Sequence, residues 1–353
     1  MHITNRGSSM DHELESPSTH RERGAFEVEF IIVAALIMVM VGAVGSMVLA
    51  ARRAQRFVDL NSSVTTTTQD VMEYMRGELG SATHLFEWDI WGFNYLTNLD
   101  IGSKPLLSGR RLPWIDVGGV FNNDAVLGVY KTGNTLLYSI QDRTDSFDVA
   151  PGETVRTNIY RIVCWYLTKI PGKNHIVDND AFDLVHWVSE PLADWDSVDK
   201  VTDPAKKLAL VNHLYNGTNP SEPAYPYPVT RLLWKHGQDD WTTAFNLIQS
   251  DGSTVAPPAG WKIPANLDSS QLDGLLGYKR MAIASNSAGS ARGVHRYASW
   301  YDAADGYPHG LEVQIIGPAS ARQVLLHLTI CSQNDGAEQA FMDLQGIVDT
   351  RDL

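Results

Sequence analysis

The longest apolar run of the chain lies near its beginning. Residues 30–51 read FIIVAALIMVMVGAVGSMVLAA, and none of these 22 residues is charged. A helix rises 1.5 Å per residue, so this run would extend for about 33 Å, enough to cross the ~30 Å hydrocarbon core of a bilayer. The apolar region of an ordinary secretory signal is shorter, at roughly 7–15 residues. The pattern therefore predicts a single transmembrane helix.

The spacing of apolar residues changes after this run. They recur at intervals typical of one face of an amphipathic helix, at Phe57, Leu60, Val64, Val71, Met75, Leu79 and Ala82. The β-branched run VTTTT, which begins at residue 64, favours a helix less than its surroundings. We predict one long helix from Ala25 to about His84, with residues 25–56 in the membrane and 57–85 as a stem. The alternative is two helices that break near Asn61.

Beyond the stem, the helical spacing gives way to short stretches rich in β-branched and aromatic residues. They predict two strands within residues 125–140, and further strands at 158–168, 182–189 and 310–317. The expected fold class is therefore α+β. Its long, hydrophobic N-terminal helix would pack on an antiparallel, β-rich head of residues 86–353.

Two other parts of the head have their own patterns. Residues 196–290 are rich in Pro, Asn, Asp and Gly, which predicts a largely irregular insert. One helix is expected inside it, because Asp203 suits an N-cap, Pro204 the first helical position and Gly217 the residue after the end. We also predict that residues 336–348 close the head with a helix.

Composition narrows the classes of function. The chain has 28 Lys and Arg against 41 Asp and Glu, a net charge of −13, which argues against a nucleic-acid-binding surface. Two cysteines, Cys164 and Cys331, lie in apolar, strand-like stretches. They are expected either as two buried free thiols or as one disulfide in an oxidising compartment.

Catalytic motifs are missing from the sequence. It contains no G-x-S-x-G, H-E-x-x-H, C-x-x-C, P-loop or G-x-G-x-x-G pattern, so we predict a protein that is not an enzyme. Asp178, Asp180 and Asp183 could offer oxygen ligands to calcium, but the Gly turn and distal Glu of an EF-hand are absent. A solvated loop is the alternative, and no other cofactor is expected. His186 is expected to be a packed or surface residue and not a ligand. The tryptophans are expected to pack in the core or at interfaces, and the alternative is a surface that stacks on carbohydrate.

The stretch RERGAFEVEF at residues 21–30 resembles the prepilin signature of type IV pilins and type II secretion pseudopilins. In that signature a polar leader ends in a basic residue and Gly, and an apolar helix follows with Glu at its fifth position. By this resemblance residues 1–24 are the leader, cleavage falls between Gly24 and Ala25, and Glu29 is the fifth mature residue. Glu27 is an additional acid that the family pattern does not include.

The resemblance implies the processing, partners and location of the chain. A prepilin peptidase would remove the leader and methylate the new amino group of Ala25. Glu29 would neutralise the terminal ammonium of a neighbouring pilin or pseudopilin subunit during assembly. The protein would cross the bacterial inner membrane once, in contact with its lipid, with the head in the periplasm or extracytoplasmic space.

The head adds a narrower resemblance. Residues 158–195, with the segments RIVCWYL and DLVHWVSEPLADW, look like the corresponding strands of J-type minor pseudopilins. This implies a structural subunit of a type II secretion pseudopilus or of a type IV pilus-like filament. The alternative is a periplasmic binding or enzymatic head that an uncleaved N-terminal helix anchors to the membrane.

Overall fold

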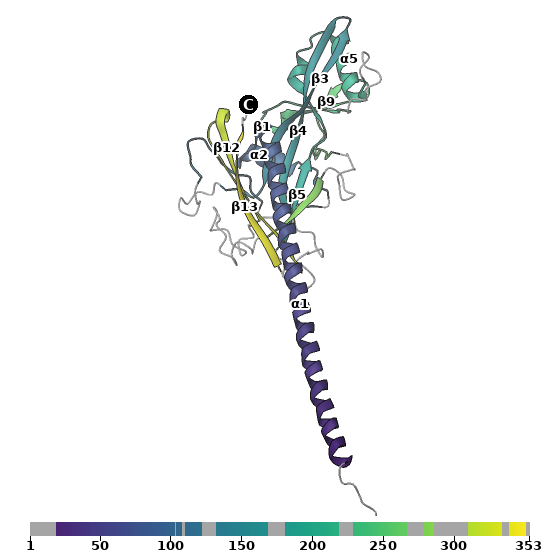
Figure 1. Ribbon diagram of the computed structural model, residues 1–353. Coiled ribbons are helices and arrows are strands. Elements are labelled where there is room, and N and C mark those ends of the chain that lie inside the picture. The colour runs from purple at the N-terminus through teal and green to yellow at the C-terminus, as the bar shows by residue number, and fades with distance from the viewer. Residues whose placement is uncertain are drawn as a thin grey trace, which may run out of the picture. The chain divides into compact units, whose positions relative to one another are not determined.

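The computed structural model divides the chain into two units, residues 1–58 and 59–353 (Figure 1). It describes residues 19–353 except 103, 108–109, 122–131, 169–180, 219–228, 267–277, 286–309, 334–338 and 351–353. Within these, only the backbone is described for residues 19–25, 181–182, 278–285, 331–333, 339 and 341.

The first helix, α1, is continuous from Thr19 to Leu79, so the alternative of a break near Asn61 is wrong. Two threonine hydroxyls of the β-branched run find acceptors within the helix. The Thr65 hydroxyl donates to the carbonyl of Asn61 at 2.8 Å, and the Thr68 hydroxyl donates to that of Val64 at 2.7 Å. Each polar group thus finds its acceptor one turn back on the same helix. The helix also begins six residues before the predicted position, Ala25.

The second unit contains the remaining helices and strands. The helices are α2 (Ile90–Thr97), α4 (Trp195–Asp199), α5 (Pro204–Asn216), α6 (Trp241–Ala244) and the 3-10 turn η3 (Ala319–Ala321). The strands are β1 (Ala82–Leu85), β2 (Ile115–Asp116), β3 (Leu136–Ala150), β4 (Glu153–Thr168), β5 (Ala181–Val188), β6 (Leu192–Asp194), β7 (Leu232–Trp234), β8 (Phe245–Ile248), β9 (Thr254–Val255), β10 (Tyr278–Ser285), β11 (Leu311–Ile316), β12 (Arg322–Gln333) and β13 (Gln339–Thr350).

These strands form one branched sheet. Its main path runs β2-β11-β12-β10-β5-β4-β6-β7-β8-β9, while β3 pairs with β1 and β4, and β13 pairs with β12. The β2–β11 and β6–β7 pairs are parallel, and the other strand pairs are antiparallel. The predicted α+β class and antiparallel head are therefore confirmed. The strands predicted at 158–168, 182–189 and 310–317 correspond to β4, β5 and β11; the first strand predicted within 125–140 falls largely outside the described residues.

The second half of strand β4, residues 162–168, is buried on both faces. Val163, Trp165 and Leu167 face the core that contains the stem, while Ile162, Cys164 and Tyr166 face a second core with α2 and α6. This explains why residues 162–167 read as a continuous apolar run, since neither face of this half of β4 meets water. A third, smaller core lies between the β3–β4 hairpin and helices α4 and α5.

The predicted C-terminal helix is wrong, because the segment forms β13. All twelve residues of β13 pair in an unbroken register with β12, from Arg322–Thr350 to Gln333–Gln339. Alternate side chains such as Ala340 and Val348 enter the stem core. Pairing and burial along a whole strand outweigh the modest helix preference of residues such as Met, Leu and Gln.

The predicted irregular insert is also partly wrong. Up to residue 266 it holds α5, α6 and the short strands β7, β8 and β9. Helix α5 agrees with its prediction. The Asp203 carboxylate accepts from the backbone N–H groups of Ala205 and Lys206 at 2.8 and 3.3 Å, and Gly217 ends the helix with φ 64°. Strands of two to four residues are too short to show a period in the sequence.

Candidate functional site

The predicted processing site lies in the first turns of α1. The backbone is helical across Gly24 and Ala25 and onward through Glu29. Residues four apart share one face of a helix, with about 5–6 Å between Cβ atoms, so Ala25 and Glu29 lie on the same side. Glu27 lies about 200° around the axis from Ala25, at 3.6 residues per turn. Glu27 and Glu29 therefore lie on different faces of the helix.

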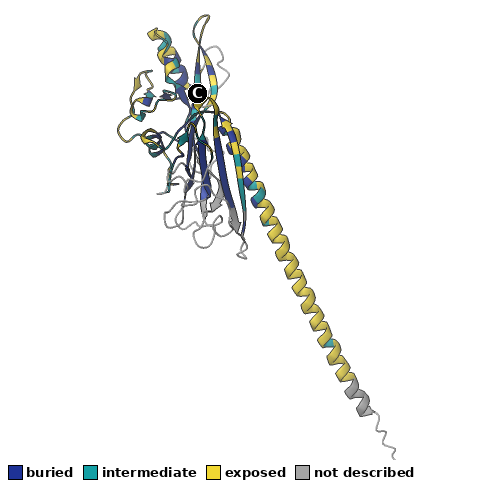
Figure 2. Ribbon diagram, turned by 90° about the vertical axis from the view of Figure 1, so that its left-hand side faces the viewer, coloured by how far each residue is buried: buried dark blue, intermediate teal, exposed yellow. Residues whose placement is uncertain are grey.

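The part of α1 that follows exposes apolar side chains on every side. Phe26, Ile31, Met38 and Val41 are each more than 60% exposed, and Figure 2 shows this stretch coloured as exposed. Among the described residues α1 is the one helix that is long and apolar enough to cross a membrane. A helix that is apolar all round needs lipid or other helices around it.

The stem is different, because the head buries one of its faces. Val64, Val71, Met75 and Leu79 are each at most 3% exposed, as the predicted stripe requires. The other members of that stripe are Leu60, which is partly buried, Ala82, which is buried in β1, and Phe57, which is 46% exposed and thus not part of the stripe.

Two buried residues of this face, Met72 and Thr68, were missed by the sequence analysis. Thr68 is fully buried, four residues after Val64. Its spacing fitted the stripe, but its hydroxyl excluded it from a list of apolar residues. The bond from this hydroxyl to the Val64 carbonyl makes the burial tolerable, since a buried polar group must be hydrogen-bonded.

A polar cluster joins the end of the stem to the sheet. The Glu78 carboxylate lies 2.9 Å from Nε2 of His186 on β5, and it accepts a hydrogen bond from the Tyr138 hydroxyl on β3 at 3.0 Å. Nε1 of Trp165 on β4 donates to the same hydroxyl at 3.2 Å. The carboxylate of α1 thus contacts β3 and β5 directly, and β4 is linked to it through the Tyr138 hydroxyl. We call Glu78, Tyr138, Trp165 and His186 the Glu78 cluster.

The electrostatics of the Glu78 cluster favour neutral tyrosines. Burial, and then the charge of Glu78, raise the pKa of Tyr138 well above its ordinary value. The same causes raise the pKa of Tyr74, one turn before Glu78, to about 12. Tyr138 therefore remains a donor to the carboxylate over the physiological range of pH. His186 is 4% exposed and packs against the Trp165 ring, so of the two expected placements, packed or at the surface, it is packed.

A second buried ionic cluster lies on the sheet face opposite the stem. His327 on β12 places Nδ1 at 2.7 Å from Glu312 on β11, and Nε2 at 2.5 Å from Asp343 on β13. The Thr329 hydroxyl donates to the same Asp343 oxygen at 2.9 Å. Burial by itself lowers the pKa of His327, but the two carboxylates outweigh it and raise the pKa to about 9. Because both ring nitrogens are occupied, this histidine links three strands and has no nitrogen left for a metal.

The structure bears on the two alternatives for the cysteines. Cys164 is a free thiol, fully buried in β4, and burial raises its pKa. Cys331 belongs to β12, which is separated from β4 by β10 and β5. Three strand spacings are about 14 Å, whereas a disulfide requires Cα atoms within about 7 Å. These observations favour the free-thiol alternative for Cys164, and the pairing with Cys331 stays a prediction.

The predicted calcium ligands are only partly described. Asp178 and Asp180 lie outside the described residues, and Asp183 is a buried residue of β5. Within the described part of the chain no three His, Cys, Asp or Glu side chains are grouped so as to hold a metal. The calcium site stays a prediction.

Comparisons with known proteins add no assignment. No protein-family model, curated protein or solved structure matches this chain. A function for the chain must therefore be argued from its own residues.

Proposed function

We propose that this chain is a membrane-anchored, non-enzymatic subunit of a pilin-type filament, most similar to a J-type minor pseudopilin of a type II secretion system. One observation carries the proposal: the two parts of α1 have different surroundings. Residues 26–58 expose apolar side chains on all sides, and the stem, residues 59–79, is buried along one face by an antiparallel sheet. A filament subunit needs both, an apolar helix for lipid and neighbouring helices, and a head fixed to its stem.

The acid at the start of the apolar helix supports the same function. Cleavage after Gly24 would leave an ammonium group at Ala25, on the helical face that carries Glu29. A lone carboxylate is costly at membrane depth, and a positive partner removes most of that cost. We infer that the Glu29 of one subunit meets the Ala25 ammonium of another when their apolar helices bundle.

The proposal also names the partners and location of the protein. Prepilin peptidase would process the leader, other pilin or pseudopilin subunits would bind α1, and inner-membrane lipid would surround it before assembly. The head would lie in the periplasm or another extracytoplasmic space. A phosphatase fused after Leu353 is expected to be active, whereas an active cytoplasmic reporter at the same point would contradict this orientation.

The decisive experiment is mass spectrometry of the N-terminus of protein purified from its native host. We expect an N-terminus at Ala25 that carries a methyl group. Gly24→Val places a branched side chain at the cleavage site and should leave the leader attached, while the matched change Gly7→Val within the leader should not. An intact leader in the unaltered protein would reject the proposal in favour of an anchored periplasmic head.

A further inference from the structure

The longest open edge of the sheet belongs to β13. This strand pairs with β12 over twelve residues, and no described strand pairs with its other side. The other open edges among the described strands are shorter: β2 and β9 have two residues each, β1 has four with an irregular register, and β3 is unpaired on the same side only beyond β1, at residues 141–150. A long edge presents a row of backbone N–H and C=O groups to which another strand can bind.

Natural sheets usually protect such an edge, and β13 lacks the common means. Its sequence, QAFMDLQGIVDT, contains no Lys and no Pro, and its register has no bulge. Its two acids are turned to partners within the sheet. Asp343 accepts from Thr329 and contacts His327, and Asp349 accepts from Gln323 at 3.0 Å.

The side chains along this edge are suited to an added strand. A Cβ on Gly346 would lie 3.1 Å from the sulfur of Met72, so the even-numbered residues of β13 face α1. On that face Met342 and Leu344 are only partly buried, although they pack against the stem core. On the other face Gln345 and Ile347 are exposed. A strand beside β13 would therefore cover apolar surface with every second residue.

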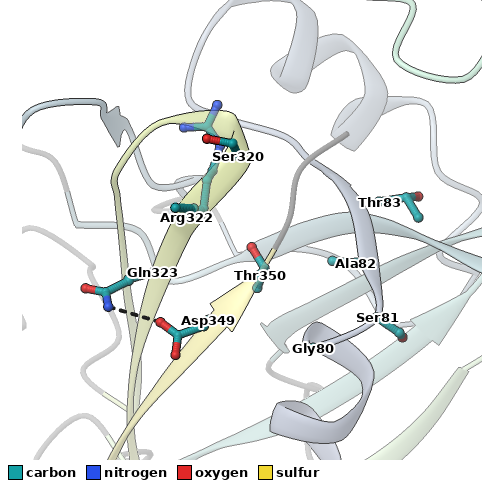
Figure 3. A pocket seen from close by; sticks show the side chains of 10 residues that line it. Gly80, Ser81, Ala82, Thr83, Ser320, Arg322, Gln323, Asp349 and Thr350 are labelled. Carbon is teal, nitrogen blue, oxygen red and sulfur yellow. Dashed lines mark hydrogen bonds between the residues drawn. The ribbon is translucent and has the colours of Figure 1, made fainter.

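A pocket continues this edge at the end of the strand. Its volume is about 540 Å³, and it is lined by the end of β13, the start of β12 and the residues that lead from α1 into β1. Figure 3 shows Thr350 between Gln323 of β12 and Ala82 of β1. Thr350 is 3% exposed, and its hydroxyl has no hydrogen-bond partner among the described residues. The pocket thus lies where the end of β13 and the start of β1, both edge strands among the described residues, come together.

We propose that the β13 edge and this pocket form an acceptor groove for an extended strand of a neighbouring filament subunit. The inference deepens the proposed function and rests on it for the identity of the partner. Pairing of backbone groups would supply affinity, and alternate side chains would supply specificity.

The residues of the groove indicate which side chains the added strand of the neighbouring subunit would carry. Apolar residues at every second position would cover Met342 and Leu344. Lys or Thr at the positions between would lie beside Gln345 and the Asp349 carboxylate, on a chain whose net charge is −13.

The test uses the full-length protein in detergent micelles. The probe is a synthetic peptide as long as β13 that alternates Val with Lys or Thr and carries ¹³C in its valine carbonyls. We expect saturable binding together with a shift of the ¹³C amide I band to its β-sheet position. A peptide of the same composition with its valines grouped together should not bind. Equal binding of both peptides, or binding without the band shift, would overturn the proposal.

A pair of matched variants locates the site. Ile347 on β13 is 50% exposed and Val255 on the β9 edge is 43% exposed. Ile347→Lys places a charge against the basic peptide and should weaken binding by about ten-fold or more, equivalent to ~1.4 kcal/mol. Val255→Lys should leave binding unchanged. If the Ile347→Lys variant does not unfold cooperatively, the test uses Gln345→Lys instead. Gln345 is also exposed on β13, and we expect the same loss of peptide binding. Unchanged binding in the β13 variant would reject the groove.

A second measurement separates this inference from the proposed function. A photo-crosslinking residue at position 347, expressed in the native host, should join β13 to an extended segment of another filament subunit, while one at position 255 should not. Crosslinks only to helical segments would overturn the proposal. Peptide binding by a protein that retains its leader would support the groove while rejecting the filament role.

Discussion

The two parts of α1 form one continuous helix but bury different fractions of their side chains. Between residues 26 and 58 the helix exposes apolar side chains around its whole circumference. Between residues 59 and 79 one stripe is buried and the opposite face is polar and exposed. The first pattern requires a partner outside the described chain, whereas the second finds its partner in the chain's own sheet.

The comparison teaches that helix propensity alone does not define the role of a helical segment. Both parts tolerate residues that weaken helices, namely Gly42 and Gly45 in the apolar part and the threonine run in the stem. What differs is the distribution of apolar positions around the axis. Substitutions in the two parts should therefore change different properties, assembly for the first and the free energy of unfolding of the head for the second.

The largest expected effect is on assembly. Glu29→Ala removes the proposed partner of the Ala25 ammonium, and breaking such a buried pair costs roughly 3–5 kcal/mol. Membrane insertion should remain, since the variant carries one charge fewer beside the apolar run. Crosslinking to other pilin-like subunits in the native host should be lost. Glu27→Thr, on another face of the helix, is the control; normal crosslinking of Glu29→Ala would refute the assigned role.

The next effect is on the stability of the head. Leu79 is fully buried at the end of the stripe, so Leu79→Ala leaves a cavity that costs roughly 2–5 kcal/mol of unfolding free energy. Val39→Ala, at a position 69% exposed in the apolar part, should change the same quantity by less than about 0.5 kcal/mol. Urea unfolding in detergent, followed by tryptophan fluorescence, measures both. Similar losses of unfolding free energy in the two variants would contradict the difference between the stem and the apolar part of α1.

The pH dependence of the unfolding free energy should arise from the second unit alone, through His327. The pKa of His327 is about 9 in the folded protein, above its ordinary value of 6.5. The raised pKa contributes stability that is fully present below pH 6.5 and is lost as pH rises through 9. Its size is on the order of 3 kcal/mol, at ~1.4 kcal/mol per pH unit.

The control for this profile is His327→Gln, which should remove the decline between pH 6.5 and 9. The helical circular dichroism of the apolar part should not follow the decline. A head stability that stays constant over this range in the unaltered protein would contradict the ionic link between the three strands.

The smallest expected effect concerns the Glu78 cluster. Glu78→Gln keeps an acceptor for the Tyr138 hydroxyl and should cost about 1 kcal/mol, whereas Glu78→Ala leaves that hydroxyl buried without its acceptor and should cost about 1–3 kcal/mol. Glu73→Gln, at an exposed position of the same helix, should have no measurable effect. If all three variants unfold at the same urea concentration, the cluster does not hold the stem in place.

Local signals in the sequence predicted much of this fold. Asp203, Pro204 and Gly217 determine α5 through capping chemistry that acts over one turn. The stripe from Val64 to Leu79 was visible because it repeats over several turns. Where the determinants of an element are adjacent in the chain, the sequence was sufficient.

The errors occur where distant segments determine the outcome. β13 is a strand because β12 offers a complete edge to it, and nothing within residues 339–350 shows this. Glu78 meets Tyr138 and His186 from positions 60 and 108 residues away, so no motif could reveal the cluster. For the predicted processing residues, the backbone is helical at Ala25 and Glu29 as expected, and also at Gly24, before the predicted start of the helix. Their roles stay predictions.

The short connection after the stem has a mechanical consequence. Gly80 and Ser81 lead directly from α1 into β1, a strand of four residues paired only with β3. Tension applied along α1 therefore reaches a β-ladder with few hydrogen bonds, which would yield early if it bore the load alone. The buried stripe and Glu78 share that load along several turns of the stem. Resistance to pulling should thus scale with the length of the stripe, so that a subunit under traction loses its stem contacts turn by turn before its sheet comes apart.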